Sequence, residues 1–428
     1  MVRTAHIKAA LCSRHGQLRT APESRVLCRM GRKMLFLLFC LLFLASCGNS
    51  GVSRPDANAI QPETSENAPN ASAVSENAHT GTVGETDENL AEKEKFVVDC
   101  DGNTVAIPAI VDRVAALYAY NGHLTVMLGA EDKLVAVIEG LKRDMLIRRK
   151  IPDIVDYPVP FTVDTINIES LMMTRPDVVF LRRDTGGNQG ETEKLMKAGI
   201  PYAVVDYSSI EEQKYSIQLA GEILNQQQNA QDYLDYYTST IAMIEERVAE
   251  IPEEKRLRVY QSVNEVVRTN HPGEISYEIL DIVGAVNVAK AFTGELSGDK
   301  AFVNVETIYL WDPDCIVAIE PSAVNYLRTN ENFASLRCVR EGRVYQLPVG
   351  ATRWTHPGSL ETPIGALALA KLLYPDSFAD VDMQKETRDF YQNFWRIDLT
   401  DEEIGEILSG SGMRLPKDRA VGGESGLS

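Results

Sequence analysis

The feature that most constrains the fold of this chain is an internal repeat. Residues 167–179 read NIESLMMTRPDVV and residues 304–316 read NVETIYLWDPDCI, and the two stretches align without a gap. Each copy predicts a short helix capped by Asn, a break at Pro-Asp and then a buried strand, over 178–181 and 316–319. Two copies so far apart in one chain predict two lobes built on the same plan.

The region before the first copy alternates strands with helices. Two alternating apolar runs flank Asp101-Gly102-Asn103 and predict a hairpin over 96–108. A strand over 111–117, a loop over 118–122, a helix over 123–129 and a strand over 135–138 are expected next. This alternation predicts an α/β protein with Rossmann-like, doubly wound lobes.

A long helix is predicted between the two repeats. Within 209–251, the stretches 218–224 and 230–251 are rich in Ala, Gln, Glu, Ile and Tyr. Apolar residues of 230–251 fall at helical spacing, so that one helix face is apolar: Tyr233, Tyr237, Ile241, Ile244 and Val248. A helix of about 22 residues spans about 33 Å, enough to bridge two lobes along their backs. Pro252 ends this stretch, and a strand over 257–263 begins the second lobe. The expected lobes are therefore 96–208 and 253–412, with a bridging region over 209–252.

The first 47 residues resemble a secretion signal. Residues 34–44 form an unbroken apolar run behind Arg29, Arg32 and Lys33, and the run is shorter than the roughly 20 residues of a spanning helix. Leu44-Ala45-Ser46-Cys47 resembles a bacterial lipobox, whose Cys is acylated and becomes the mature N-terminus. An ordinary signal peptide that contains a Cys is the alternative. Met30 is a more typical start than Met1, which leaves open whether residues 1–29 are translated.

Two segments lack the composition of a folded core. Residues 48–95 are rich in Asn, Ser, Glu, Ala, Thr and Pro and have few large apolar residues, and residues 413–428 have the same character. Such segments bury too little surface to offset chain entropy, so both are expected to be disordered. The first would serve as a flexible spacer between a lipid anchor and the folded body.

Charge and cysteine content exclude several classes of function. The formal net charge of −18 argues against nonspecific nucleic-acid binding and against a broad grip on anionic membranes, since both need Lys and Arg. Six His and seven Cys without a CxxC pair make zinc-finger and iron–sulfur sites improbable. We therefore expect no nucleic-acid partner and no intrinsic cofactor.

In order along the chain, these features resemble the helical-backbone class of ABC-transporter substrate-binding proteins, which carries iron-siderophores, haem and cobalamin. The resemblance runs from about residue 96 to 408 and rests on the hairpin, the LGAEDKLVAV segment at 128–137, the repeated Glu-(x)6-Pro-Asp units, the bridging helix and the lipobox. It implies two α/β lobes joined by a rigid helix, with the ligand in a cleft between them. A ligand in this cleft agrees with the general rule that open α/β sheets bind ligands beyond the carboxyl ends of their strands.

The resemblance also implies the partners. In this family one surface Glu on each lobe contacts Arg residues of a permease dimer that works with a cytoplasmic ATPase, and Glu169 and Glu306 are the matching positions. A carboxylate in the first turn of a helix is favoured by the helix dipole and can form bidentate pairs with Arg. The alternative is that both residues merely stabilise the helix starts.

The candidate ligand residues lie in loops expected to line the cleft. They are Tyr118, Tyr120, Asn121, Arg182 and Arg183 in the first lobe, and Arg268, His271, Tyr277, Arg353, Trp354, His356 and Glu361 in the second. Aromatic rings offer planar contact to a macrocycle or catecholate, and Arg offers paired donors to carboxylates. Each has a structural alternative: half-buried strand ends for the tyrosines, a solvated pair for the 182–183 arginines, a turn at His271 and packing against the final helices for 353–356.

The histidine count bears on the kind of ligand. The folded body has only His123, His271 and His356, too few for a cage around bare zinc or manganese. A preformed metal chelate is therefore preferred, either an iron-siderophore, haem or a corrinoid, with His271 or His356 as a potential axial ligand for haem. Cys100, Cys315 and Cys338 are odd in number, and a Cys315–Cys338 bond is left open.

The leading hypothesis is a lipid-anchored extracytoplasmic protein that captures a metal chelate, delivers it to an ABC importer and performs no catalysis. A secreted two-lobed enzyme is one alternative, but the chain has neither a GxSxG elbow nor an HExxH motif. A surface haem or cobalamin scavenger that is not coupled to a permease is another.

Overall fold

The computed structural model describes residues 93–162, 165–292, 296–297 and 300–415. The predicted signal, Cys47, nearly all of the predicted spacer and residues 416–428 lie outside these described ranges. No helix within them combines the length and apolar character needed to cross a membrane.

The first lobe is built on a parallel sheet of four strands in the order β4-β3-β7-β8. Its strands are β3 (Val114–Ala116), β4 (Leu134–Ala136), β7 (Val178–Leu181) and β8 (Tyr202–Val204). They are short and almost wholly apolar, as expected for strands covered on both faces. The lobe's helices are α2 (Ala119–Met127), α3 (Met145–Lys150), α4 (Ile168–Thr174), α5 (Arg183–Gly186) and α6 (Gln189–Ala198).

Two small antiparallel pairs accompany this sheet. The hairpin of β1 (Glu94–Val98) and β2 (Thr104–Pro108) confirms the prediction from Asp101-Gly102-Asn103. Gly102 has φ of 81°, the left-handed conformation that such a turn requires. The second pair is β5 (Phe161–Thr162) with β6 (Thr165–Ile166).

The second lobe repeats the plan of the first. Its parallel sheet has the order β11-β9-β14-β15, so that in both lobes the first strand lies between the second and the third. The strands are β9 (Arg258–Ser262), β11 (Val286–Asn287), β14 (Cys315–Ala318) and β15 (Val344–Gln346). A smaller sheet joins β10 (Arg268–Thr269), β12 (Leu296–Ser297) and β13 (Lys300–Phe302). Its helices are α9 (Ile275–Ile282), α10 (Val305–Trp311), α11 (Pro321–Thr329) and α12 (Arg337–Arg340).

The two copies of the repeat have the same local structure. Asn167 caps α4 by accepting a hydrogen bond from the Ser170 amide at 3.0 Å, and Asn304 caps α10 by accepting from the Thr307 amide at 2.7 Å. Both helices end at a residue with positive φ, Arg175 at 46° and Asp312 at 37°. The predicted cap, break and strand are therefore confirmed in both lobes, with the second strand beginning one residue earlier than predicted.

The Asp of each Pro-Asp pair ties the repeat to the first strand of its own sheet. In the first lobe, Oδ2 of Asp177 accepts hydrogen bonds from the amides of Asp112 and Arg113, both at 2.9 Å, directly before β3. In the second, Oδ2 of Asp314 accepts from the amide of Arg258 at 2.9 Å, where β9 begins. The two arginines donate back to carbonyls at the helix ends, each at 2.6 Å. We call this arrangement the Asp–Arg lock, and it gives the Asp of both Pro-Asp pairs the same structural role.

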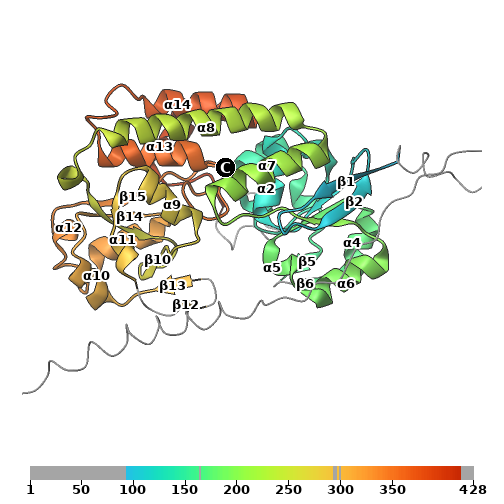
Figure 1. Ribbon diagram of the computed structural model, residues 1–428, viewed down its shortest axis with the longest axis horizontal. Helices are drawn as coiled ribbons and strands as arrows, with labels where there is room; N and C mark the ends of the chain where they lie inside the picture. Colours follow the sequence, from blue (N-terminus) through green and yellow to red (C-terminus); the bar gives the residue numbers. More distant parts are fainter. Residues whose placement is uncertain (1–92, 163–164, 293–295, 298–299, 416–428) are drawn as a thin grey trace, which may run out of the picture. The chain divides into compact units, whose positions relative to one another are not determined.

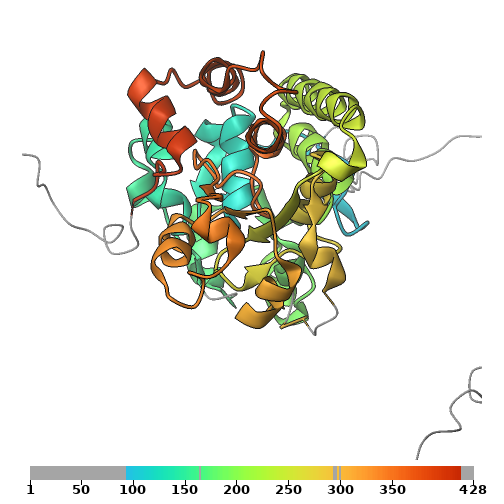
Figure 2. The same ribbon diagram turned by 90° about the vertical axis from the view of Figure 1, so that its left-hand side faces the viewer.

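The bridging region consists of two helices, α7 (Ile210–Leu224) and the 23-residue α8 (Gln227–Ala249). The five predicted apolar residues of α8 are buried. The helix packs against α7, α9 and α13 (Thr362–Leu373), and its Asn229 donates to the Leu128 carbonyl of the first lobe, so it contacts both lobes (Figure 1). Figure 2 shows α8 nearly end-on beside the C-terminal helices. After α13 the chain forms α14 (Met383–Phe390), a π-helical turn (Tyr391–Trp395) and α15 (Asp401–Ser409).

Two sequence expectations about the folded body are wrong. The predicted loop over 118–122 is mostly helix, because α2 begins at Ala119 directly after the Tyr118 cap position. The predicted disordered tail does not begin at 413: the Met145 amide donates to the Met413 carbonyl, and the Leu415 amide donates to the Arg143 carbonyl, both at 2.8 Å. The chain end thus crosses from α15 to the first lobe.

Candidate functional site

Two cavities lie between the lobes, near the carboxyl ends of the parallel strands. The larger, the arginine cavity, has a volume of about 710 Å³ and is lined by Arg143 of the first lobe, Glu320 and Arg353 of the second, and Arg414 of the chain end. The smaller, the His271 cavity, has about 310 Å³ and is lined by Tyr118, Arg182, Arg183 and Asp206 from one side and His271 and Glu274 from the other. Their position agrees with the general rule for ligands of open α/β sheets.

Arg353 is held in place at the wall of the arginine cavity. Its Nη1 donates to Oδ1 of Asn264 at 2.7 Å and to Glu320, and its Nη2 donates to Nε2 of His356 at 2.8 Å. Burial and the charge of Arg353 hold the pKa of His356 well below its usual value, so the imidazole is neutral and accepts. His356 thus supports Arg353 from behind.

Arg143 and Arg414 line the same cavity because residues 413–415 of the chain end pair with residues 143–145 of the first lobe. Residues Asp144 and Arg414 form a single antiparallel bridge, and Nη2 of Arg414 donates to the Gly140 carbonyl at 3.0 Å. Within the described residues, the buried Nε of Arg414 has no hydrogen-bond partner. Burial lowers the pKa of both Arg353 and Arg414, and neighbouring arginine charges lower each further. Three guanidinium groups against two carboxylates, Glu265 and Glu320, favour an anionic ligand here.

A buried carboxyl group supports the loop that carries Arg353. Glu361 has no exposed surface and accepts hydrogen bonds from the Thr352 amide at 2.9 Å and from the hydroxyl groups of Thr352 and Tyr391. Burial raises the pKa of Glu361 to about 7. Because its oxygens bind groups of the loop and of the π-helical turn, Glu361 shapes the cavity wall without lining it.

The His271 cavity has a more balanced charge. The Arg183 guanidinium is bound to Asp101 at 2.8 Å, Ser208 at 3.0 Å and Glu212 at 3.3 Å, which identifies a structural role. Asp206 accepts from the Arg183 amide at 2.8 Å, and its burial raises its pKa. Nδ1 of His271 donates to the Pro272 carbonyl at 2.8 Å, leaving Nε2 3.7 Å from Glu274.

The predicted ligand residues divide into two groups. Tyr118, Arg182, Arg183 and His271 line the smaller cavity and Arg353 lines the larger, with His356 directly behind it. The others lie outside both cavity walls: Tyr120, Asn121, Arg268, Tyr277, Trp354 and Glu361. Helix α2 turns Tyr120 into the core, where its hydroxyl lies 2.7 Å from that of Ser216. Trp354 is fully buried, and Tyr277 has the Lys290 ammonium group 5.8 Å above its ring.

The sequence reasoning missed Arg143, Arg414 and Tyr207. The Tyr207 hydroxyl accepts from the Gly358 amide and donates to the Ser359 carbonyl, both at 2.9 Å, which ties the first lobe to the loop of the second. One signal was available, because Asp206-Tyr207 directly follows the apolar run of β8 and so stands at the carboxyl end of a parallel strand. For Arg414 there was no such signal, since only the crossing of the chain end brings it to the cavity.

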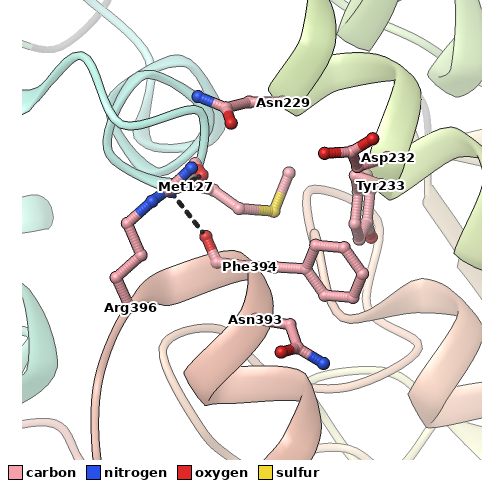
Figure 3. A pocket seen from close by; sticks show the side chains of 7 residues that line it. All are labelled: Met127, Asn229, Asp232, Tyr233, Asn393, Phe394 and Arg396. Atoms are coloured by element: carbon pink, nitrogen blue, oxygen red, sulfur yellow. Dashed lines mark hydrogen bonds between the residues drawn. The ribbon is translucent and has the colours of Figure 1, made fainter.

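A third cavity, of about 340 Å³, lies where the end of α2 meets α8 and the π-helical turn (Figure 3). Arg396 donates to the carbonyls of Met127 at 3.0 Å and Phe394 at 3.2 Å. Asn229 donates to the Leu128 carbonyl at 2.9 Å. These bonds hold the first lobe to α8 and to the C-terminal helices, which gives Asn229 and Arg396 a structural function.

Glu169 and Glu306 are exposed in the first turns of α4 and α10, one in each lobe. Cys100, Cys315 and Cys338 are free thiols, and burial raises the pKa of all three. Among the residues that the structure describes, no three His, Cys, Asp or Glu side chains are grouped to hold a metal ion.

Two similar α/β lobes, a helix that joins them and cavities between them define a two-lobed solute-binding protein. Residues 114–349 match the family model described as periplasmic binding protein, and the chain belongs to that family. It is thus an extracytoplasmic binding protein that serves an ABC transporter, in a family of binding proteins and not of enzymes.

Relatives support the assignment at low sequence identity. The molybdate-binding protein MolA of Haemophilus influenzae is 24% identical over 71% of this chain and 91% of its own length. An uncharacterized ABC transporter substrate-binding lipoprotein of Bacillus subtilis, YvrC, is 24% identical over 66% of this chain and 86% of its own length.

Solved structures show the same fold. MolA bound to molybdate has a TM-score of 0.63 with 22% identity over 72% of this chain and 99% of its own. A periplasmic solute-binding protein of Veillonella parvula has a TM-score of 0.64 with 24% identity over 74% and 98%. CeuE of Helicobacter pylori with Ni(II) bound has a TM-score of 0.59 with 22% identity over 74% and 100%.

Proposed function

We propose that this protein captures an anionic metal chelate, such as an iron-siderophore or haem, in the arginine cavity and delivers it to an ABC importer. The observation that carries the proposal is the convergence of Arg143, Arg353 and Arg414 on one cavity between the lobes. A desolvated guanidinium is strongly favoured by an anionic partner, and its planar fork fits carboxylate and catecholate oxygens.

The size of the cavity supports a chelate. A volume of about 710 Å³ falls within the roughly 300–1,000 Å³ of sites for organic ligands. The arginines also favour two of the three chelates expected from the sequence. The carboxylates of haem and the carboxylates or catecholates of an iron-siderophore can pair with Arg side chains better than a corrinoid can. The low number of histidines in the sequence supports a metal that arrives already chelated.

A metal oxyanion is the second candidate. MolA, a relative over most of the chain, binds molybdate, and a tetrahedral oxyanion would find the same three arginines favourable. The two candidates differ in what they need from the cavity: an oxyanion would fill only a small part of it, whereas a chelate would contact both lobes at once.

Delivery requires a site on the membrane and a docking surface. The lipobox at Cys47 supports a lipid anchor, and the lipoprotein relative YvrC supports it independently. Glu169 and Glu306 support docking, since each places an exposed carboxylate on a separate lobe where Arg residues of a permease subunit could pair with it. The many hydrogen bonds between the lobes, through Tyr207, Arg396 and the chain end, favour only modest closure on the ligand.

Isothermal titration of the full chain with a ferric tricatecholate, ferric citrate, haemin, cyanocobalamin and sodium molybdate tests the proposal. We expect saturable binding of one anionic chelate, weakened at least about tenfold in R353Q and R414Q through the loss of a charged hydrogen bond. The control R340Q removes the same charge from an exposed position on α12 and should bind normally. Binding of molybdate alone would select the second candidate, and binding of cyanocobalamin alone would contradict a site for anionic ligands.

A further inference from the structure

Two apolar side chains stand out on the surface of the described residues. Met173 is 84% exposed and Leu310 is 85% exposed, more than any other large apolar side chain in that part of the protein. Single exposed apolar residues are common on protein surfaces and need no explanation. These two, however, occupy the same position, the seventh, in the two copies of the repeat.

Neither residue is needed for the packing of its helix. In both copies the fifth position faces the core, and Leu171 and Ile308 are completely buried there. The helix caps, the residues with positive φ and the Asp–Arg locks are likewise at other positions of the repeat. An exposed Met and an exposed Leu at equivalent positions of two lobes therefore have no explanation in the stability of either helix.

Each of these residues lies four positions after an exposed glutamate. Met173 follows Glu169 on α4, and Leu310 follows Glu306 on α10. Residues four apart are neighbours on the same helix face, so each lobe presents a carboxylate beside an apolar side chain. Figure 1 shows α4 and α10 in different lobes. We call each Glu and apolar pair an acid–apolar patch.

We propose that Met173 and Leu310 are the apolar anchors through which this protein docks on its permease dimer, with one acid–apolar patch on each permease subunit. This inference rests on the proposed delivery to an importer. Two equivalent patches produced by an internal repeat match a partner that presents the same surface twice, as a twofold dimer does. The carboxylates would pair with cations on that partner. We therefore expect each permease subunit to have an apolar pocket beside an Arg side chain.

The two parts of a patch would contribute differently. An exposed ion pair is weakened by salt and acts mainly on the association rate and on orientation. A Met or Leu that becomes buried in a pocket contributes free energy that salt does not screen, and buried apolar anchors at the centre of an interface dominate its affinity. The complex should therefore retain a salt-resistant component that depends on Met173 and Leu310.

The experiment measures binding of the full chain to its own permease–ATPase complex in lipid nanodiscs, together with stimulation of ATP hydrolysis. M173S and L310S should each weaken binding about tenfold, and the double variant more, at both low and high salt. Solute affinity should not change. M196S is the matched control, since Met196 on α6 is 60% exposed but lies outside the repeat.

The outcomes separate this inference from the proposed function. If wild type binds the complex and M173S/L310S binds equally well, the apolar anchors are refuted while the importer function stands. If wild type itself does not bind, the proposed delivery fails. An effect of L310S without one of M173S would overturn the twofold arrangement, and an equal loss in M196S would show that exposed methionines act nonspecifically.

Discussion

Nη2 of Arg353 lies 2.8 Å from Nε2 of His356, and the guanidinium is the donor. The imidazole accepts because it is neutral, since burial and the adjacent positive charge lower its pKa. Arg353, an arginine of the ligand cavity, is thus oriented by a histidine that does not itself line the cavity. A change of pH should therefore change the free energy of unfolding in a direction that follows from the lowered pKa of His356.

Acidification should destabilise the protein through His356. In the unfolded chain a His titrates near pH 6.5, whereas folded His356 stays neutral to well below that value, so stability is lost as the pH falls below about 6.5. The expected loss is about 1 kcal/mol per pH unit. H356Q keeps an acceptor for Arg353 but cannot titrate, so urea unfolding at pH 7 and pH 5.5 should show a smaller loss than in wild type. An equal loss in both proteins would contradict a neutral, buried His356.

Glu361 should act in the opposite direction. Its folded pKa of about 7 lies above the unfolded value near 4.5, so the folded state holds a proton that the unfolded state has lost. Stability therefore falls as the pH rises from about 4.5 to 7, by up to about 3 kcal/mol. E361Q should remove this contribution in urea unfolding measured across that range, so that its stability rises more steeply with pH than that of wild type. The control E245Q, at an exposed position of α8, should keep it.

The Asn caps of the repeat should contribute equally in the two lobes. N167A and N304A each remove the oxygen that accepts a backbone hydrogen bond at the start of α4 or α10. Each substitution should lower the free energy of unfolding by about 1 kcal/mol, measured by chemical denaturation. N325A is the control, because Asn325 is exposed inside α11, where alanine favours the helix. A cost in only one lobe would show that the caps are not equivalent.

Gly410 should be required for the turn that directs the chain end toward the first lobe. Its φ is 74°, and a Cβ atom there would lie 2.1 Å from Cγ of Gln346 and 2.8 Å from the Leu347 carbonyl oxygen. G410A should destabilise the protein by about 1 kcal/mol or more and weaken ligand binding by displacing Arg414. G405A is the matched control within α15, where a Cβ meets no atom and alanine should stabilise the helix. Scanning calorimetry measures the change in stability, and isothermal titration measures the change in ligand affinity.

Much of the fold could be predicted because its signals are local. The Asn caps, the Pro-Asp breaks and the apolar runs of β7 and β14 depend on neighbouring residues, and the duplication of the pattern predicted two lobes. The spacing of Tyr233 through Val248 likewise predicted α8 within a few residues at each end. The start of α2 was misplaced because Tyr118-Ala119-Tyr120 has no strong capping signal, and that error placed Tyr120 and Asn121 in the cleft instead of the core.

The site was only partly predictable because its residues come together from distant segments. Arg353 and His271 were identified by their place in loops, and Glu361 was selected for the same reason although its carboxyl group is buried. Periodicity and the repeat are properties of order along the chain, so they determine the number of lobes and the bridging helix. The class of protein was expected from the family resemblance and is shown by the family match. Only tertiary packing decides which guanidinium groups share a cavity, since Arg143 and Arg414 meet through hydrogen bonds between distant segments, such as the bond from Arg414 to the Gly140 carbonyl, 274 positions away in the sequence.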